Sequence, residues 1–264
     1  TFIDFFEDLS LSEKSRKKHL QLEQNVLDSA DKVITVSQSW AKRFQEKTKT
    51  DVQVITNGYD PEDFKPETTS SASAQFTLCH IGSLNKDRSA PIFWEAVSEL
   101  CAENKAFEKQ VNIQIIGSVS ADLKEQIGER GLEKQVELIS HLPHKEVLSQ
   151  LTKAHCSLLF INNTSNKGGI IPGKLFEYLA ARNPILCVGN KEGDSSEIIR
   201  SAQAGKVFDF NDKQGIKTEL AAAFELFQLG TPSKLDGGGI GKYSRKNLAK
   251  QYLSLLNELT LPLR

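Results

Sequence analysis

The sequence predicts an α/β fold built on a doubly wound parallel sheet. From about residue 76 onward, short apolar runs alternate with longer segments of helical period. The apolar runs are nearly continuous, which is typical of strands whose two faces are both covered by helices. The regular alternation of strand and helix favours a parallel arrangement. Glycines also follow three of the expected strands, at Gly82, Gly117 and Gly189.

Six strands and six helices are expected in this region. The strands are Phe76 to Ile81, Val111 to Ile116, Val136 to Ile139, Cys156 to Ile161, Pro184 to Val188 and Lys206 to Phe210. Amphipathic segments predict helices over about 91–105, 120–130, 144–153, 173–182, 194–202 and 213–228. Ligands of such sheets bind beyond the carboxyl ends of the strands, so the glycines mark the edge where a site is expected.

The first 66 residues are organised differently. They predict a charged helix over about 13–29, a strand from Lys32 to Val36, a helix over about 38–47 and a strand from Val52 to Thr56. This is too little material for a self-sufficient domain. The polar run Glu67 to Ser73 is expected to connect it to the main domain. A last helix is expected from Tyr243 to Leu259.

Composition excludes several classes of partner. The chain has 264 residues, a net charge of −1 and 25% charged residues, as ordinary globular domains do. This charge argues against nucleic-acid binding, and no apolar run approaches the roughly 20 residues of a membrane helix. The four cysteines are expected to be reduced core thiols of a cytoplasmic protein, and their spacing predicts no metal site.

The most informative segment lies between the fourth and fifth expected strands. A glycine-rich loop, Gly168 to Gly173, leads into a helix that carries Lys174 in its first turn and Glu177 almost one turn later. Backbone N–H groups and the helix dipole at such a terminus bind phosphate, and Lys174 adds a mobile positive charge. The Glu177 carboxylate suits a pair of sugar hydroxyls, so the segment predicts a phosphate site beside a sugar.

This stretch, Pro172 to Tyr178, resembles the Pro-x-Lys-x-x-Glu-Tyr motif of the retaining glycosyltransferases with the GT-B fold (family 4, group 1). Three further segments resemble the same family in the same order, namely Ala30 to Ser37, Ile55 to Asp60 and His80 to Leu84. The resemblance implies a Rossmann-like donor-binding domain over residues 67–241. It also implies that residues 1–66 are the end of a truncated acceptor-binding domain, and that residues 242–264 form a helix that could cross back to it.

The resemblance implies roles for particular residues. Arg88 and Lys174 are expected to stabilise the leaving diphosphate as the catalytic cations, and Glu177 to orient the ribose. The remaining expected donor-binding residues lie in loops at the strand ends: Gly82, Ser83, Gly117, His141 and Leu142.

One position departs from the family pattern. The first of the family's paired glutamates belongs eight residues before Glu177, where this sequence has Gly169. This departure places the contacts to the donor sugar, and catalytic competence, in question. We expect the backbone amides of Gly169, Ile170 and Ile171 to substitute for the missing carboxylate, because the backbone can approach a ligand closely where side chains are small.

The resemblance implies transfer of a hexose from a UDP- or GDP-sugar to a saccharide or lipid-linked acceptor, with retention, as in polysaccharide biosynthesis. It implies neither a cofactor nor a bound metal, and it leaves peripheral membrane contact open. The catalytic step needs groups from the truncated domain, so this chain alone is expected to bind nucleotide without turnover. Two alternatives remain: a nucleotide-sugar epimerase of the same fold, and a non-catalytic nucleotide-sugar-binding subunit.

Overall fold

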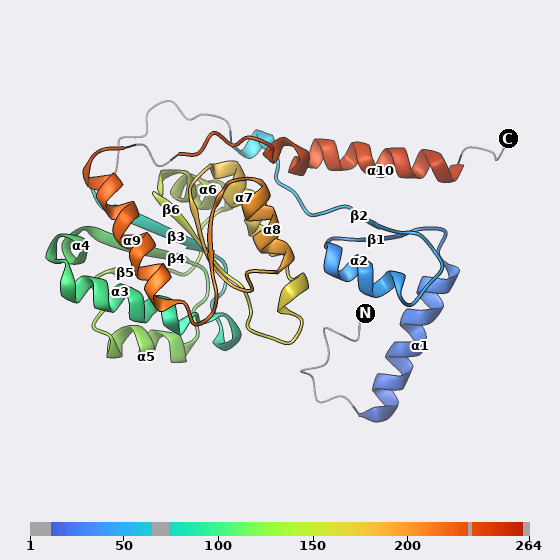
Figure 1. Cartoon of the computed structure of the whole chain (residues 1–264), viewed down its shortest axis with the longest axis horizontal. Helices are drawn as coiled ribbons and strands as arrows, with labels where there is room; N and C mark the ends of the chain where they lie inside the picture. The colour runs from blue at the N-terminus through green and yellow to red at the C-terminus, as the bar shows by residue number, and fades with distance from the viewer. Residues whose placement is uncertain (1–11, 65–73, 232–233, 261–264) are drawn as a thin grey trace.

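The computed structural model describes residues 12–64, 74–231 and 234–260, and its main body is a six-stranded parallel sheet (Figure 1). The strand order is β5-β4-β3-β6-β7-β8. The strands are β3 (Phe76–Ile81), β4 (Val111–Ile116), β5 (Val136–Ile139), β6 (Cys156–Phe160), β7 (Ile185–Val188) and β8 (Gly205–Phe208). The predicted α/β fold with a doubly wound sheet is therefore confirmed.

The direction of winding reverses between β3 and β6. From β3 the chain builds outward through β4 to β5, then returns to β6 and continues to β8 on the other side. The ladder between β3 and β4 runs from Phe76 to Ile81, whereas β3 pairs with β6 only at Leu78 and Cys79. This reversal point is where open α/β sheets bind ligands, at the carboxyl ends of the strands.

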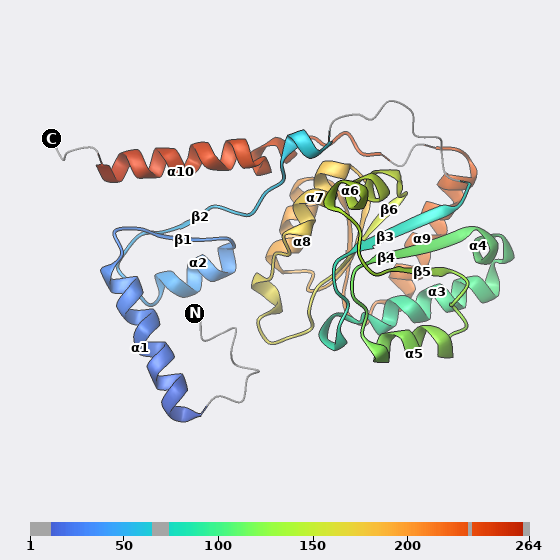
Figure 2. The same ribbon diagram turned by 180° about the vertical axis from the view of Figure 1, so that it is seen from behind.

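Helices cover both faces of the sheet (Figures 1 and 2). One face packs in a single apolar core with α3 (Pro91–Glu103), α4 (Lys105–Gln110), α5 (Ala121–Glu129) and α9 (Lys213–Gln228). A second core joins the other face to α6 (His144–Lys153), α7 (Lys174–Ala181) and α8 (Asp194–Ser201). The central strands β3, β6 and β7 are buried between these layers, which explains their continuous apolar sequences, whereas the edge strand β5 is partly exposed.

Most elements lie within one or two residues of their predicted bounds; for example, β6 ends at Phe160 rather than Ile161 and β7 begins at Ile185 rather than Pro184. Two differences are larger or have a clear physical reason. In place of the single helix expected over about 91–105 there are two helices: α3 ends at Glu103, and the extended Asn104 separates it from α4. The Asn104 side chain accepts from the N–H groups of Ala106 and Phe107. Asparagine favours such a cap over a helix interior. The last strand begins at Gly205 rather than Lys206 and ends at Phe208.

The amino-terminal segment forms a small unit beside the main body. It consists of α1 (Glu13–Ser29), β1 (Val33–Thr35), α2 (Gln38–Gln45) and β2 (Val52–Val54), with β1 and β2 paired in parallel. Its core is Leu27, Trp40 and Phe44. A two-stranded sheet is not stable by itself, so this unit depends on contacts with its surroundings. The connection expected at Glu67 to Ser73 lies outside the described residues.

The chain returns to this unit at its carboxyl end. A short turn, η5 (Ile240–Tyr243), precedes α10 (Arg245–Thr260), which extends toward the amino-terminal unit (Figure 2). The Tyr59 N–H donates to the Tyr243 carbonyl at 3.1 Å, and the Arg245 N–H donates to the Tyr59 carbonyl at 2.8 Å. Among the described helices, none is both long and apolar enough to cross a membrane.

Candidate functional site

The loops after β3 and β4 meet through two glycines. The Gly82 N–H donates to the Ile116 carbonyl at 2.8 Å, and both glycines have positive φ, +99° at Gly82 and +144° at Gly117. A Cβ on Gly117 would lie 2.6 Å from the Gly82 carbonyl oxygen. The close approach of these two loops therefore requires glycine at position 117.

Lys174 reaches from the start of α7 to the end of β3. Its Nζ donates to the Ile81 carbonyl at 2.6 Å and lies 3.0 Å from His80 Nε2. The other ring nitrogen of His80, Nδ1, lies 2.9 Å from the Leu158 carbonyl, which can only accept. His80 Nδ1 therefore carries the proton, and Nε2 accepts from Lys174. This contact holds the ammonium group next to Gly82.

Burial and a neighbouring cation lower the pKa of Lys174. Loss of hydration is the larger cause and the positive charge of Arg88 the second, and together they bring the pKa from 10.5 to about 7. Burial also holds the pKa of His80 well below its usual 6.5, so this ring stays neutral. Lys174 and Arg88 are two neighbouring, partly desolvated cations, and such a pair favours the binding of an anion.

Anion binding at this place should decrease as the pH rises. A bound diphosphate stabilises the charged form of Lys174, so binding above about pH 7 should take up a proton and weaken up to tenfold per pH unit. Calorimetry of UDP binding at pH 8, in two buffers of different ionisation enthalpy, should show uptake of about one proton. Affinity that stays constant between pH 7 and pH 9 would contradict this assignment, since phosphate oxygens titrate lower, at about pH 6.

Arg88 belongs to a turn, η3 (Lys86–Arg88), that joins the loops after β3 and β6. Its Nε donates to Asn162 Oδ1 at 2.7 Å, and Nη1 lies 3.5 Å from the carbonyl of the exposed Ser83. Half-burial lowers its pKa, but a guanidinium keeps its charge at neutral pH. Arg88 and Lys174, both predicted from the sequence, are thus brought to the same reversal point of the sheet.

Tyr178 is a buried residue of this region to which the sequence assigned no role. Its hydroxyl accepts from the Ile81 N–H at 2.9 Å and donates to the Leu158 carbonyl at 3.2 Å. Where the ladder between β3 and β6 has ended, this hydroxyl bridges the two strands. The signal was present, because tyrosine completes the motif that carries Lys174 and Glu177.

Glu177 lies on the exposed side of α7 beside a histidine. Its Oε1 is 3.3 Å from Nε2 of His144, and the side chains of Glu177 and His144 are 26% and 58% exposed. His141, listed among the expected donor-binding residues, is exposed in the loop after β5, and Leu142 packs against the core that contains α7. His144 is therefore the histidine in contact with the predicted ribose carboxylate.

The glycine-rich loop is fixed by contacts from outside it. Gly169 ends the turn η4 (Lys167–Gly169), its N–H donates to the Asn166 carbonyl at 3.2 Å, and its carbonyl accepts from Trp40 Nε1 at 3.0 Å. The Ile170 carbonyl accepts from Ser195 Oγ at 2.6 Å. The Gly169 N–H already donates to Asn166, so of the three backbone amides expected to contact the donor only those of Ile170 and Ile171 remain candidates.

The first turn of α7 offers further donors. Leu175 and Phe176 each donate the backbone N–H to the carbonyl three residues earlier, that of Pro172 and of Gly173, as in a 3₁₀ turn. Within the described part of the chain, the N–H groups of Gly173 and Lys174 donate to no protein acceptor. Unpaired amides and a lysine at a helix N-terminus can together hold a diphosphate.

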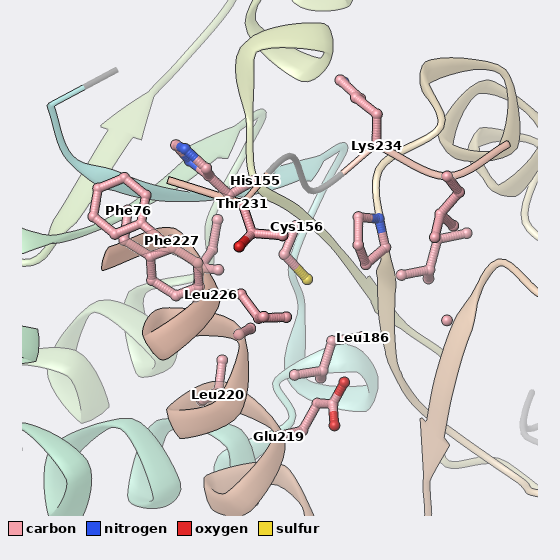
Figure 3. Close-up of a pocket in the computed structure, with 16 residues that line it drawn as sticks. Phe76, His155, Cys156, Leu186, Glu219, Leu220, Leu226, Phe227, Thr231 and Lys234 are labelled. Carbon is pink, nitrogen blue, oxygen red and sulfur yellow. The ribbon is translucent and has the colours of Figure 1, made fainter. Parts of the chain in front are cut away.

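A separate apolar cavity of about 250 Å³ lies at the amino ends of the strands, away from the site around Lys174 (Figure 3). It is bounded by the beginnings of β3 and β6, at Phe76 and Cys156, and by Leu220 and Phe227 of α9. The charged residues in its lining include Lys234, which already donates to the Thr152 and Ala181 carbonyls. This cavity is unsuited to an anion and is not continuous with the site around Lys174. Among the described residues, no cluster of histidine, cysteine or acidic side chains could hold a metal ion.

Comparisons with known proteins place this geometry in context. The sequence profile described as "Glycosyl transferases group 1" matches residues 61–228. No curated protein matches the sequence. Among solved structures, S. aureus TarM in complex with fondaparinux, alpha-GlcNAc-glycerol and UDP is similar with a TM-score of 0.67 at 14% identity, over 96% of this chain and 48% of TarM.

Two further structures share the fold. WaaG, a glycosyltransferase involved in lipopolysaccharide biosynthesis, has a TM-score of 0.65 at 14% identity, over 100% of this chain and 69% of WaaG. The UDP-forming alpha,alpha-trehalose-phosphate synthase of Burkholderia vietnamiensis has a TM-score of 0.70 at 7% identity, over 93% and 65% of the two chains. The chain thus spans about half to two thirds of the length of these structures.

Proposed function

The chain belongs to the group 1 glycosyltransferase family, and on this basis we propose that it binds a UDP- or GDP-sugar between the loop after β3 and the first turn of α7. The observation that carries the proposal is the position of Lys174, whose ammonium group is held beside Gly82 by His80 and the Ile81 carbonyl. The pyrophosphate would lie against Lys174 and the unpaired amides of α7, within the field of Arg88.

This placement assigns a chemical role to each group. When the sugar leaves its diphosphate, negative charge develops on the phosphate, and Lys174 and Arg88 stabilise it as preorganised cations. Glu177 accepts from the ribose hydroxyls and is also in contact with His144. Gly82, Ser83 and Gly117 let the backbone approach the donor, and His141 and Leu142 flank the base. The proposed mechanism uses neither a metal nor a cofactor.

The proposed reaction is transfer of a hexose, with retention, to a saccharide or lipid-linked acceptor in the cytoplasm, in polysaccharide biosynthesis. Peripheral contact with a membrane would bring such an acceptor within reach. The structures of TarM with UDP and of a UDP-forming synthase support a donor in which the sugar is linked to a nucleoside diphosphate. Within the proposed organisation, residues 67–241 bind the donor, residues 1–66 close the acceptor side, and residues 242–264 return to it.

We further propose that this chain alone binds nucleotide without transferring sugar, because it spans only about half to two thirds of the related structures. A non-catalytic nucleotide-sugar-binding subunit is the second candidate. It is favoured by Gly169, where a side chain would collide with Trp40. Detectable sugar transfer by this chain would contradict the first statement, and transfer by a longer protein that contains it would exclude the second candidate.

Calorimetric titration with UDP, GDP and ADP tests the proposed function. We expect one site per chain, with UDP or GDP bound more tightly than ADP. Absence of binding by all three diphosphates at millimolar concentration would contradict the proposal. The same titration with uridine, which lacks the pyrophosphate, is the matched control and should show far weaker binding because it forfeits the contacts to Lys174 and α7.

A further inference from the structure

The amino-terminal unit contacts the glycine-rich loop through one indole ring. Trp40 of α2 is 5% exposed, and its Nε1 donates to the Gly169 carbonyl at 3.0 Å. A Cβ on Gly169 would lie 2.5 Å from this nitrogen and 2.9 Å from Cδ1 of the same ring. The indole therefore fills the space that any side chain at position 169 would need.

Neighbouring contacts hold this indole in place. Ser37 Oγ accepts from the Trp40 N–H at 3.2 Å, which caps the start of α2. Ser39, the residue before Trp40, donates its N–H and its hydroxyl to the Asp194 carboxylate at 2.9 and 3.0 Å, and Asp194 is the first residue of α8. The first turn of α2 is thus fixed to the main body through Ser39 as well as through the indole of Trp40.

The same contacts set the orientation of the peptide groups that precede α7. In a trans peptide the carbonyl and the following N–H point in opposite directions. Because the Gly169 carbonyl faces Trp40, the Ile170 N–H points away from the indole. The next carbonyl, of Ile170, is held by Ser195, which is also buried. Two consecutive peptide planes are therefore fixed by buried donors, and Pro172 and Lys174 follow directly.

We propose that Trp40 is a positioning residue for the diphosphate site. Acting through the Gly169 carbonyl, it fixes the backbone that leads to Lys174, so that a residue of the acceptor side sets the affinity for the donor. This inference rests on the proposed function and adds a residue 129 positions away in the sequence from its contact. The hydrogen bond from Trp40 to Gly169 would then couple donor binding to the contact between the amino-terminal unit and the main body.

The first test separates the hydrogen bond from the packing. Trp40→Phe keeps an aromatic ring and removes the indole N–H, and we expect the Kd for UDP to rise about five- to tenfold. Phe44→Leu is the matched control, because Phe44 packs against Trp40 on the same helix and in the same small core. It should change the Kd less than about twofold, since the Gly169 contact remains.

The second test asks whether the two residues act together. Gly169→Ala should weaken UDP binding because its methyl group collides with the indole, and combining it with Trp40→Leu should restore part of the affinity by making room. If Trp40 did not act on the donor site, Trp40→Leu would leave the Kd of the Gly169→Ala protein unchanged. Partial rescue by the double variant supports the proposal, and a double variant that binds UDP no better than Gly169→Ala alone overturns it.

The two proposals fail in distinguishable ways. If wild-type protein binds UDP and Trp40→Phe binds it equally well, the role of Trp40 is wrong and the donor site stands. If wild-type protein binds no nucleoside diphosphate, the proposed function falls and the role of Trp40 with it. Amide hydrogen exchange provides an independent check, because Trp40→Phe should speed exchange in residues 168–174 and Phe44→Leu should not.

Discussion

Replacing Lys174 with methionine should abolish useful nucleotide binding while leaving the fold as stable as before. A charge-assisted contact to pyrophosphate is worth about 1.5–3 kcal/mol, so the Kd for UDP or GDP should rise about 10- to 150-fold. The free energy of unfolding should not fall, because two effects oppose each other. Removing a buried cation is favourable, since its desolvation is no longer needed. This gain offsets the loss of the hydrogen bonds that Lys174 gives to His80 Nε2 and the Ile81 carbonyl.

Titration calorimetry and urea unfolding at pH 7 measure these two quantities separately. Lys124→Met is the matched control, because Lys124 is exposed on α5, and both its affinity and its stability should equal those of the wild type. An unchanged Kd in Lys174→Met would remove Lys174 from the site. A strongly destabilised Lys174→Met variant would mean that this lysine stabilises the fold rather than binding a ligand.

Gly117→Ala should be the most destabilising single substitution at the site. The added methyl would meet the Gly82 carbonyl oxygen at 2.6 Å, and the φ of +144° is one that side chains rarely adopt. Because the atom that it meets is backbone, the collision cannot be relieved by a rotamer change, and we expect a loss of about 3 kcal/mol or more. Domains are typically stable by about 5–15 kcal/mol, so this is a large fraction.

Gly131→Ala is the control for the backbone conformation alone. Gly131 also has a positive φ, +65°, but no atom lies within 4 Å of the added methyl. We expect a loss of about 1 kcal/mol there. Urea unfolding followed by circular dichroism compares the two variants. Equal losses would show that the contact between the loops after β3 and β4 contributes nothing to stability.

The order of elements could be predicted from the sequence because burial leaves a local signature. Strands covered on both faces read as continuous apolar runs, and the predicted strand from Phe76 to Ile81 matches β3 at both ends. The interruption at Asn104 was not predicted, because asparagine is tolerated within helices and becomes a cap only when the next segment turns away. Gly205, the first residue of β8, was not predicted as part of the strand because glycine is depleted in strands.

Part of the site could also be predicted, where it depends on local spacing. Lys174 and Arg88 follow glycine-containing loops at the ends of strands, and the strand order brings them together. The contacts of His80 with Lys174 and of Trp40 with Gly169 join residues 94 and 129 positions apart. Such pairs depend on how helices pack against the sheet, and the residues involved read as ordinary core positions in the sequence.

The central claim is that a nucleoside diphosphate binds where the loop after β3 meets the first turn of α7. A crystal structure of the protein soaked with UDP or GDP tests it most directly. We predict phosphate density within hydrogen-bonding distance of Lys174 Nζ and of the amides at the start of α7, next to Gly82. Diphosphate density anywhere else, with this turn left empty, would contradict the claim.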